Sequence, residues 1–590
     1  MENFKRTATC GELTKSDTGK QVTLNGWIHR SRNHGGIFFI NLRDRYGITQ
    51  VVVDDDASDE LKSAVVNLKN EYCIAVEGCV RKRPDNMINT EMATGEIEVK
   101  AERLEVLSES EVLPFQIDER TNANEDLRLK YRYLDLRSAT MQKHIILRSK
   151  VTFLVRSFLT KHGFLEIETP TFIKSTPEGA RDYLVPSRLH PGKFYALPQS
   201  PQLYKQILMV AGFDKYFQIA RCYRDEDARG DRQPEFTQID IEMSFVSRED
   251  VLNISEQMMQ YVFKEALGVE LEKHFERISY NDAISLYGSD KPDLRFDMKM
   301  QDASFMSEHS DFLAFKNVTD AGGIIKALVV KGEAKNYSRK KIEELEATAK
   351  IYKAQGLAWL KLEDGKFQGG ISKFFAGKEK IICEKLGIAE GDLVLFVADK
   401  NAKVACVSLG AVRSKLGKDL NLTKADEFKF VWIIDFPLFE WNEDEEKWDP
   451  AHHMFSAPQE KYLATLESDP ASVKGDLYDL VLNGYEIASG SIRIHKAELQ
   501  KRIFKIVGFK EEEAEKKFGF LTQAFKYGPP PHGGIAPGLD RILMIMAGET
   551  SIKEVIAFPK NTFAYSPMDE SPCEVDKKQL DELSIKIVEK

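Results

Sequence analysis

Two arginines and a run of carboxylates stand close together near residue 225 of this 590-residue chain. Residues 221–227, RCYRDED, end one expected strand, and residues 232–236, RQPEF, open a return strand. An arginine at a strand end, here Arg224, can clamp a phosphate while neighbouring carboxylates hold adenine or a metal ion. A solvated charged turn is the ordinary alternative for such a run. This segment alone leaves both interpretations open.

A glycine-rich segment, GGIAPGLDR at residues 533–541, precedes an apolar stretch. Glycines let backbone approach a flat ligand, and Arg541 would lie in the first turn of the helix that follows. A helix start together with an arginine suits a polyphosphate. An ordinary glycine-rich helix entry is the alternative.

Two carboxylates and a histidine pair complete the candidates for chemistry. Asp479 and Glu486 flank Asn483-Gly484, and seven positions along one strand would place them on opposite faces. A turn at Asn483-Gly484 would let them meet, and two carboxylates plus phosphates suit Mg²⁺. A surface pair is the alternative. His452 and His453 have no third soft ligand at useful spacing, so a substrate-loop role is favoured over zinc.

The first hundred residues alternate like a small β-barrel. Strands are expected at 22–28, 37–42, 48–53, 73–80 and 97–106, with a helix at 59–68. Three strands, a helix and two strands is the order of an OB-fold, although another small barrel would fit the pattern as well.

The remaining elements form an α+β pattern. We expect helices at 141–162, 202–210, 256–267 and 535–547, the last after Pro537-Gly538, and strands at 164–170, 216–223, 236–245, 428–436 and 484–495. Residues 113–137 look like a connector, and the lysine-rich texture of 300–420 indicates an inserted α+β domain.

Composition bounds the class of protein. The length exceeds what one core supports, so several domains are expected. Net charge is −10, which neither indicates nor excludes nucleic-acid binding. The odd number of cysteines, 7 without a C-x-x-C pair, suggests neither a disulfide framework nor structural zinc. No apolar leader or spanning segment is apparent, so we expect a cytoplasmic protein without membrane contact.

Together, these segments resemble the signature motifs of class II aminoacyl-tRNA synthetases. The segment at Arg224 resembles the second motif, the segment ending at Arg541 the third, and the helix and strand at 141–170 the first, which forms the dimer interface in that class. Three further segments resemble the aspartyl branch of bacterial type, namely TPEGARDY at 176–183, QSPQLYKQ at 199–206 and FTQID at 236–240.

The resemblance covers nearly the whole chain and implies a multidomain α+β fold. It places an OB-fold anticodon-binding barrel at 1–110, a hinge at 111–140 and a catalytic domain on an antiparallel sheet in two parts. The parts are 141–299 and 421–560, separated by the insertion at 300–420, which is of the GAD type, and followed by an extension at 561–590.

The resemblance also implies the activity: aspartate attacks the α-phosphorus of ATP, and the aspartyl-adenylate then esterifies tRNA. Arg224, Arg541 and Glu486 would act in catalysis, and Asp479 and Glu486 would hold Mg²⁺. The implied ATP site is Arg224, Asp225, Glu226, Gln233, Glu486, Gly538, Leu539, Asp540 and Arg541.

Aspartate recognition would depend on two buried cations, Lys205 and Arg493, that pair the substrate's anionic side chain. We expect asparagine to leave both cations under-compensated. The other implied contacts are Glu178, Ser200, Gln202, Asp240, His452 and His453.

For tRNA, the resemblance implies that Arg30, Phe39 and Gln50 bind the anticodon, although Phe39 could equally be a core residue. His34 matches forms that charge both tRNA(Asp) and tRNA(Asn), whereas Asn86 favours neither form. The implied partners are tRNA, L-aspartate, ATP and a second copy of the chain, with no DNA. The alternatives are an asparaginyl or lysyl enzyme and a non-catalytic tRNA-binding paralogue; retention of Arg224, Glu486 and Arg541 argues against the last.

Overall fold

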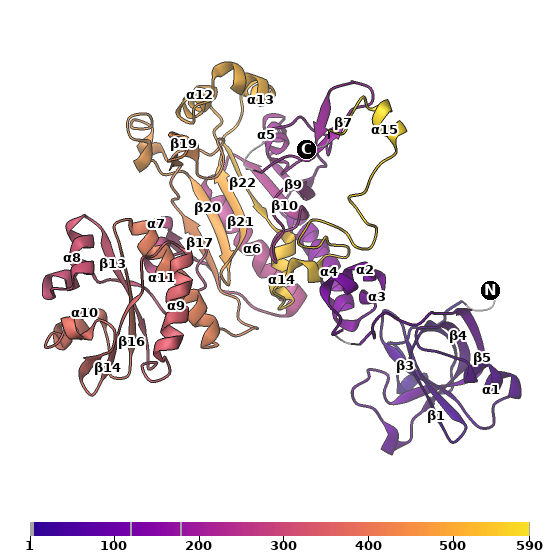
Figure 1. Ribbon diagram of the computed structural model, residues 1–590. Helices are drawn as coiled ribbons and strands as arrows, with labels where there is room; N and C mark the ends of the chain where they lie inside the picture. The colour runs from indigo at the N-terminus through magenta and orange to yellow at the C-terminus, as the bar shows by residue number, and fades with distance from the viewer. Residues whose placement is uncertain (1–4, 119–120, 177–179, 589–590) are drawn as a thin grey trace. The chain divides into compact units, whose positions relative to one another are not determined.

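The computed structural model describes residues 5–118, 121–176 and 180–588. Within it the chain forms two compact units, one mainly Met1–Ile146 and the other mainly Leu147–Ile556 (Figure 1). No helix in the described residues is long and apolar enough to cross a membrane.

The first unit contains a closed five-stranded barrel, with strand order β1-β2-β3-β5-β4. Its elements are β1 (Gln21–His34), β2 (Ile37–Arg43), β3 (Ile48–Val53), α1 (Asp59–Val66), β4 (Cys73–Lys82) and β5 (Ile97–Ser108). Alternate residues fill its interior, among them Leu24, Ile40 and Leu42. The expected OB-fold is confirmed, and β1 is longer than the expected strand.

A connector follows the barrel in the same unit. It contains α2 (Glu125–Lys130), α3 (Arg132–Asp135) and the beginning of α4 (Ala139–Lys161). The buried carboxylate of Glu71 accepts hydrogen bonds from Arg43 of β2 at 2.7 Å and from Arg137 of the connector at 2.9 Å. This shared carboxylate ties the connector to the barrel.

The second unit is built on an eight-stranded sheet that is antiparallel except at its two outermost pairs. In spatial order its strands are β11 (Glu276–Ser279), β17 (Phe430–Ile434), β20 (Leu477–Leu482), β21 (Tyr485–Ile492), β22 (His532–Pro537), β10 (Glu235–Ser244), β9 (Lys215–Tyr223) and β6 (Leu165–Glu166).

One face of this sheet packs on helices. The main core joins the sheet to α4, α6 (Arg248–Leu267) and α14 (Leu539–Met546). Along β10, Ile239, Ile241 and Met243 enter this core. Because successive strand residues point to opposite faces, Asp240 and Glu242 lie on the other face.

A second sheet, here called the inserted sheet, has the order β12-β13-β16-β14-β15. Its strands are β12 (Gln301–Asp302), β13 (Ile324–Val330), β14 (Ala358–Glu363), β15 (Lys366–Gln368) and β16 (Leu393–Asp399). One face packs on α9 (Arg339–Ile351) and α11 (Ala402–Asp419), and the other on α8 (Leu313–Asp320) and α10 (Glu379–Leu386), as Figure 1 shows. The expected α+β character of this region is confirmed.

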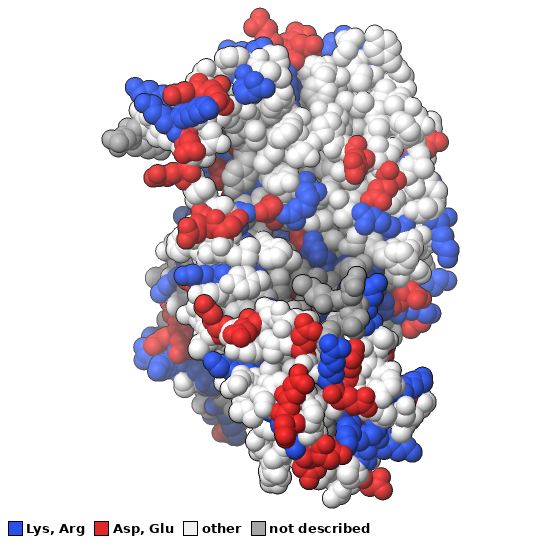
Figure 2. All heavy atoms as spheres, turned by 90° about the vertical axis from the view of Figure 1, so that its right-hand side faces the viewer, with Lys and Arg blue, Asp and Glu red and all other residues white. Residues whose placement is uncertain are grey.

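Smaller elements complete the chain. They are β7 (Leu184–Pro186), β8 (Phe194–Ala196), α5 (Gln202–Val210), α7 (Tyr280–Tyr287), β18 (Phe439–Asn442), β19 (Lys447–Pro450), α12 (Ala497–Ile506), α13 (Glu511–Ala524), α15 (Lys577–Glu582) and short 3₁₀ turns. Figure 2 shows acidic and basic side chains next to one another in several places on one face of the molecule, between wide uncharged areas.

Three expected elements were wrong in extent. α6 begins at Arg248 rather than residue 256, because Ser247 and Asp250 form a capping box ahead of it. The strand expected at 164–170 is only Leu165–Glu166. Residues 532–537 are not a helix entry but strand β22 in the middle of the sheet, and the helix begins at Leu539.

Candidate active site

A cavity of about 610 Å³ opens on the sheet face that carries Asp240. It brings together residues far apart in the sequence, from α5, the β9–β10 hairpin, β21 and the start of α14. The expected residues that line it are Ser200, Gln202, Lys205, Arg224, Glu226, Gln233, Asp240, His452, His453, Glu486, Arg493, Gly538, Asp540 and Arg541.

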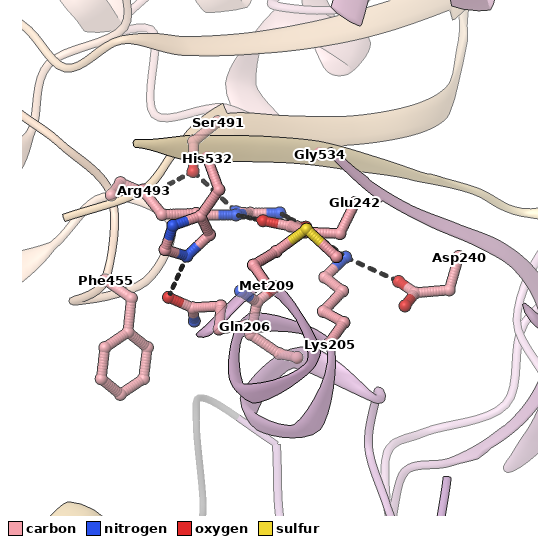
Figure 3. Close-up of polar contacts among 12 residues, drawn as sticks. Lys205, Gln206, Met209, Asp240, Glu242, Phe455, Ser491, Arg493, His532 and Gly534 are labelled. Carbon is pink, nitrogen blue, oxygen red and sulfur yellow. Dashed lines mark hydrogen bonds and ion pairs between the residues drawn. The ribbon is translucent and has the colours of Figure 1, made fainter. Parts of the chain in front are cut away.

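Four buried charges lie together at this cavity and are here called the floor quartet: Lys205, Asp240, Glu242 and Arg493 (Figure 3). Three of them line the cavity, and Glu242 lies beneath them as their partner. Lys205 Nζ lies 2.7 Å from Asp240 and 3.3 Å from Glu242. Arg493 donates from Nε and Nη2 to the two oxygens of Glu242, at 3.0 and 3.2 Å. The expectation of two under-compensated cations is therefore wrong, because each cation already has a buried carboxylate partner.

Arg493 is fixed further by its other terminal nitrogen. Nη1 donates to Ser491 Oγ at 2.6 Å and lies 3.0 Å from His453 Nε2. A guanidinium carries five N–H bonds, so one on Nη2 stays open, and the three-donor ammonium of Lys205 also keeps one. Among the described residues, the floor quartet thus keeps two N–H donors without an acceptor.

Burial and pairing act in opposite directions on the two carboxylates. Burial raises the pKa of Asp240, and Lys205 only partly offsets it. Burial would raise the pKa of Glu242 too, but Arg493 and Lys205 together lower it below its ordinary value. Glu242 is therefore the firmly ionised member of the quartet.

Sequence reasoning missed Glu242, although a signal was present. Glu242 follows Asp240 by two positions on the expected strand at 236–245, which places both carboxylates on one face. Gly534 of β22 lies opposite Glu242, and a Cβ there would come within 2.1 Å of Glu242 Oε2. The glycine makes room for this carboxylate rather than for a flat ligand.

The second group of polar residues surrounds the β20–β21 hairpin. Asn483 and Gly484 form its turn with φ of 52° and 86°, and Glu486 of β21 lies opposite Val481, two residues along β20 from Asp479. The turn thus brings the two carboxylates near each other, as the sequence allowed, although they are not cross-strand partners. Burial and the nearby Asp479 raise the pKa of Glu486. His452 Nε2 lies 3.4 Å from Asp479, and although burial alone would lower its pKa, Asp479 and Glu486 together raise it.

The arginines expected to contact phosphates lie near this hairpin. Arg541 donates to the backbone oxygen of Glu486 at 2.7 Å and pairs with Asp231 at 3.2 Å. Arg224 stacks over the Phe236 ring at 5.0 Å, and its buried Nε has no partner among the described residues. Glu226 pairs with Arg232 at 3.1 Å.

Of the residues expected to bind aspartate, ATP or Mg²⁺, three do not line the cavity and a fourth falls outside the described residues. Asp225 pairs instead with Arg181 at 3.4 Å, and the Leu539 side chain is in the main core. Asp479 lies behind His452. Glu178 falls outside the described residues. Asp540, although at the cavity wall, accepts from Arg148 at 2.5 Å and from the Thr237 backbone at 2.7 Å, which gives it a structural part in joining α4, α14 and β10.

The expected tRNA contacts are all on the barrel. Arg30 is exposed, and Phe39 is half-buried but outside the barrel core. Gln50 donates to Glu98 at 2.8 Å. His34, at the end of β1, and Asn86, in a 3₁₀ turn, are exposed.

An OB-fold barrel followed by an antiparallel sheet with this cavity defines the class of protein. Residues 124–562 match the family described as tRNA synthetases class II (D, K and N), and residues 22–107 match the OB-fold nucleic acid binding domain. The chain belongs to the class II tRNA synthetases.

Curated relatives of this chain within the class II tRNA synthetases are named aspartate–tRNA(Asp/Asn) ligases. The chain is 76% identical over 591 residues to the aspartate–tRNA(Asp/Asn) ligase of Treponema denticola, covering 100% of both chains. It is 53% identical to the enzyme of that name from Caldanaerobacter subterraneus, covering 100% of this chain and 99% of the other. For the Borreliella burgdorferi enzyme of that name, identity is 51% and coverage 98% of each.

Solved structures agree on the fold. Asparaginyl-tRNA synthetase from Pyrococcus horikoshii, complexed with asparaginyl-adenylate, matches with a TM-score of 0.58 at 19% identity, covering 94% of this chain and 98% of that one. Aspartyl-tRNA synthetase from Entamoeba histolytica matches with a TM-score of 0.57 at 19% identity, covering 95% and 92%.

Proposed function

We propose that this protein is an aspartate–tRNA ligase that charges both tRNA(Asp) and tRNA(Asn) in the cytoplasm. It activates L-aspartate with ATP and transfers the aspartyl group to the 3′ end of tRNA. The floor quartet carries the choice of amino acid, and the names of the relatives support the double tRNA specificity.

The two open donors of the floor quartet suit a carboxylate. One N–H of Lys205 and one of Arg493 can each bond to one oxygen of the aspartate side chain. Asparagine would turn its amide NH₂ toward one of these donors and leave a buried donor without an acceptor, which costs about 1–3 kcal/mol. Discrimination thus follows from the direction of hydrogen bonds, since the quartet is neutral before the substrate arrives.

The opposite end of the cavity suits ATP. Arg224 has an unpartnered buried Nε and would bind the α-phosphate, where charge develops during attack by the aspartate carboxylate. Gln233, Glu226 and the backbone at Gly538 and Leu539 would hold the adenosine, and Arg541 the terminal phosphates. Ser200, Gln202 and the histidine pair would enclose the amino acid.

Magnesium fits the hairpin. Asp479 and Glu486 are neighbouring carboxylates on one hairpin, and the field of Asp479 adds to burial in raising the pKa of Glu486. Among the described residues no group of three His, Cys, Asp or Glu side chains is arranged so that it could hold a metal ion, so an ion here would take its remaining ligands from phosphates and water. Magnesium bound there would neutralise the polyphosphate.

The barrel would read the anticodon, with Phe39 stacking on an unpaired base and Arg30 and Gln50 beside it. Arg81 of β4 is already paired with Asp54 and Glu98, at 2.5 and 2.8 Å, and is therefore not assigned to tRNA. A homodimer is supported by two exposed apolar side chains, Phe153 on α4 and Leu165 on the edge strand β6.

Aspartate-dependent ATP–pyrophosphate exchange by the purified protein tests the first reaction. We expect exchange with aspartate and none with asparagine. Lys205→Met should raise the KM for aspartate by about 10-fold or more, because a charge-assisted hydrogen bond is lost, while leaving the KM for ATP unchanged. Exchange supported equally by asparagine in the unmodified protein would contradict the assignment of the pocket.

Aspartylation of purified tRNA(Asn) beside tRNA(Asp) tests the double specificity. We expect both tRNAs to accept aspartate with kcat/KM values within about 10-fold. Charging of tRNA(Asp) alone would leave the ligase assignment intact and refute the relaxed specificity. Replacement of His34, which is exposed on the barrel, should then alter the ratio of the two.

A further inference from the structure

The segment between α7 and β12, residues 288–300, reaches the candidate active site. Its Lys291 is exposed at the cavity wall, which it shares with Gly484, Tyr485 and Glu486. Neither the resemblance nor the expected site contains this lysine. Lys291 carries a primary ammonium group beside the β20–β21 hairpin, and this cation has no role in the aspartate pocket.

Lys291 lies at the phosphate end of the cavity. It lines the cavity beside the Gly484–Glu486 turn, and Arg541, which donates to the backbone oxygen of Glu486 at 2.7 Å, lines the cavity as well. An ammonium near Glu486 is therefore placed for the polyphosphate of ATP and not for the amino acid.

An arginine of α11, a helix of the inserted sheet, fixes the course of this segment. Arg413 is 1% exposed and donates to the backbone oxygens of Met298, Asp293 and Phe296, at 2.6, 2.9 and 3.0 Å. Its guanidinium also lies 4.0 Å from the Phe296 ring centroid. Burial lowers the pKa of Arg413 to about 10. Because its acceptors are carbonyls, Arg413 holds the backbone and not a charge.

Two close approaches dock α11 on the same segment. At Gly410 a Cβ would come within 2.7 Å of the Gly288 Cα, and at Gly417 within 2.6 Å of the Phe296 ring. Real Cβ atoms do not approach so closely, so both positions need glycine. The register between α11 and the segment is thus fixed at both ends of the Arg413 contact.

The segment also touches the hairpin that carries Glu486. A Cβ on Gly484 would lie 3.3 Å from the Cβ of Asp293. Asp293 in turn pairs with Arg295 at 2.7 Å. A continuous path of contacts therefore leads from α11 through Arg413 and Asp293 to the turn beside Glu486, and Lys291 lies two residues before Asp293 on the same segment.

We propose that Lys291 binds the polyphosphate of ATP, and that Arg413 is a positioning residue through which the inserted sheet holds Lys291 at the cavity. This inference rests on the proposed ligase function and adds a contact and a role for the insertion.

Pyrophosphate exchange by the full-length protein tests Lys291. Lys291→Met should raise the KM for ATP by about 10-fold or more and leave the KM for aspartate unchanged. Lys340→Met, which removes an exposed lysine of α9 away from the cavity, is the matched control and should match the unmodified protein. If Lys291→Met left exchange intact but slowed transfer to tRNA, the lysine would serve tRNA and the inference would be wrong.

A double-mutant cycle tests Arg413. Arg413→Lys keeps the charge but cannot reach all three carbonyls, so the KM for ATP should rise about 5-fold or more. In the Lys291→Met background the same substitution should change the KM for ATP less than 2-fold, because the group it positions is gone. If Arg413→Lys raised the KM for ATP equally with Lys291 present and with Lys291 replaced by methionine, Arg413 would have only a structural role. Absence of aspartate-dependent exchange in the unmodified protein would instead refute the ligase function itself.

Discussion

At the scale of single residues, selectivity depends on which donors are left over. Lys205 and Arg493 are both paired within the floor quartet, so their net charge cannot select an anion by itself. What the quartet does is orient two N–H bonds. Glu242 is central to this, because it bonds to both cations and no substrate group replaces it.

Glu242→Gln should therefore both destabilise the protein and weaken aspartate binding. Breaking a buried pair leaves an uncompensated charge at a cost of about 3–5 kcal/mol. Because the pKa of Glu242 is held below its ordinary value, its stabilisation is present above the ordinary pKa of glutamate and is lost as pH falls through the lower folded-state value. The melting temperatures of wild type and variant should accordingly converge in acid.

Glu235→Gln is the matched control for this substitution. Glu235 stands on the same strand but is one-third exposed and pairs with Arg221 near the surface, so its loss should cost about 0–1 kcal/mol. Thermal melting at neutral pH compares the two. Equal melting temperatures for both variants would show that Glu242 contributes no more to stability than the surface residue Glu235.

At the scale of elements, periodicity predicted what local sequence determines. The strand Ile48–Val53 and the helix Gln202–Val210 were predicted to the residue, because each has a clear apolar pattern with turn residues at its ends. The extent of α6 was missed because its first residues are polar and its start depends on a cap. β22 was missed because the need for glycine at Gly534 comes from its contact with Glu242, which is distant in the sequence.

Substitution of two glycines near β22, Gly534 and Gly538, tests whether a glycine is needed there for close packing. Gly534→Ala would place a Cβ 2.1 Å from both the Ile241 oxygen and Glu242, inside a central strand. We expect a cost of about 3 kcal/mol or more and a sharp loss of soluble protein. Gly538→Ala meets nothing closer than 3.7 Å at a φ of −76° and should stay within about 0.5 kcal/mol of wild type. Similar thermal stability of both variants would contradict this account of β22.

At the scale of the whole molecule, the sequence predicted the barrel and many of the residues that line the cavity, but not the contacts that connect chain segments around them. The barrel and the residues of the cavity were predicted because they occur in recognisable runs. The contact of Arg413 with the segment that carries Lys291 joins positions more than a hundred residues apart, and no local pattern in the sequence predicts it. Such contacts depend on tertiary packing alone.

The division of labour between barrel and sheet gives the last prediction. Phe39 is outside the barrel core, beside Arg32 on the neighbouring strand, and its ring is free to stack on an unpaired base. Phe39→Leu keeps an apolar side chain but removes the aromatic face, which is worth about 1–3 kcal/mol per stacked base. We expect kcat/KM for tRNA to fall about 5- to 100-fold, while pyrophosphate exchange, which needs no tRNA, is unchanged. Phe39→Tyr retains the ring and should restore charging. Loss of exchange in Phe39→Leu would show that the barrel residue acts on the fold or the adenylate site, and not on tRNA.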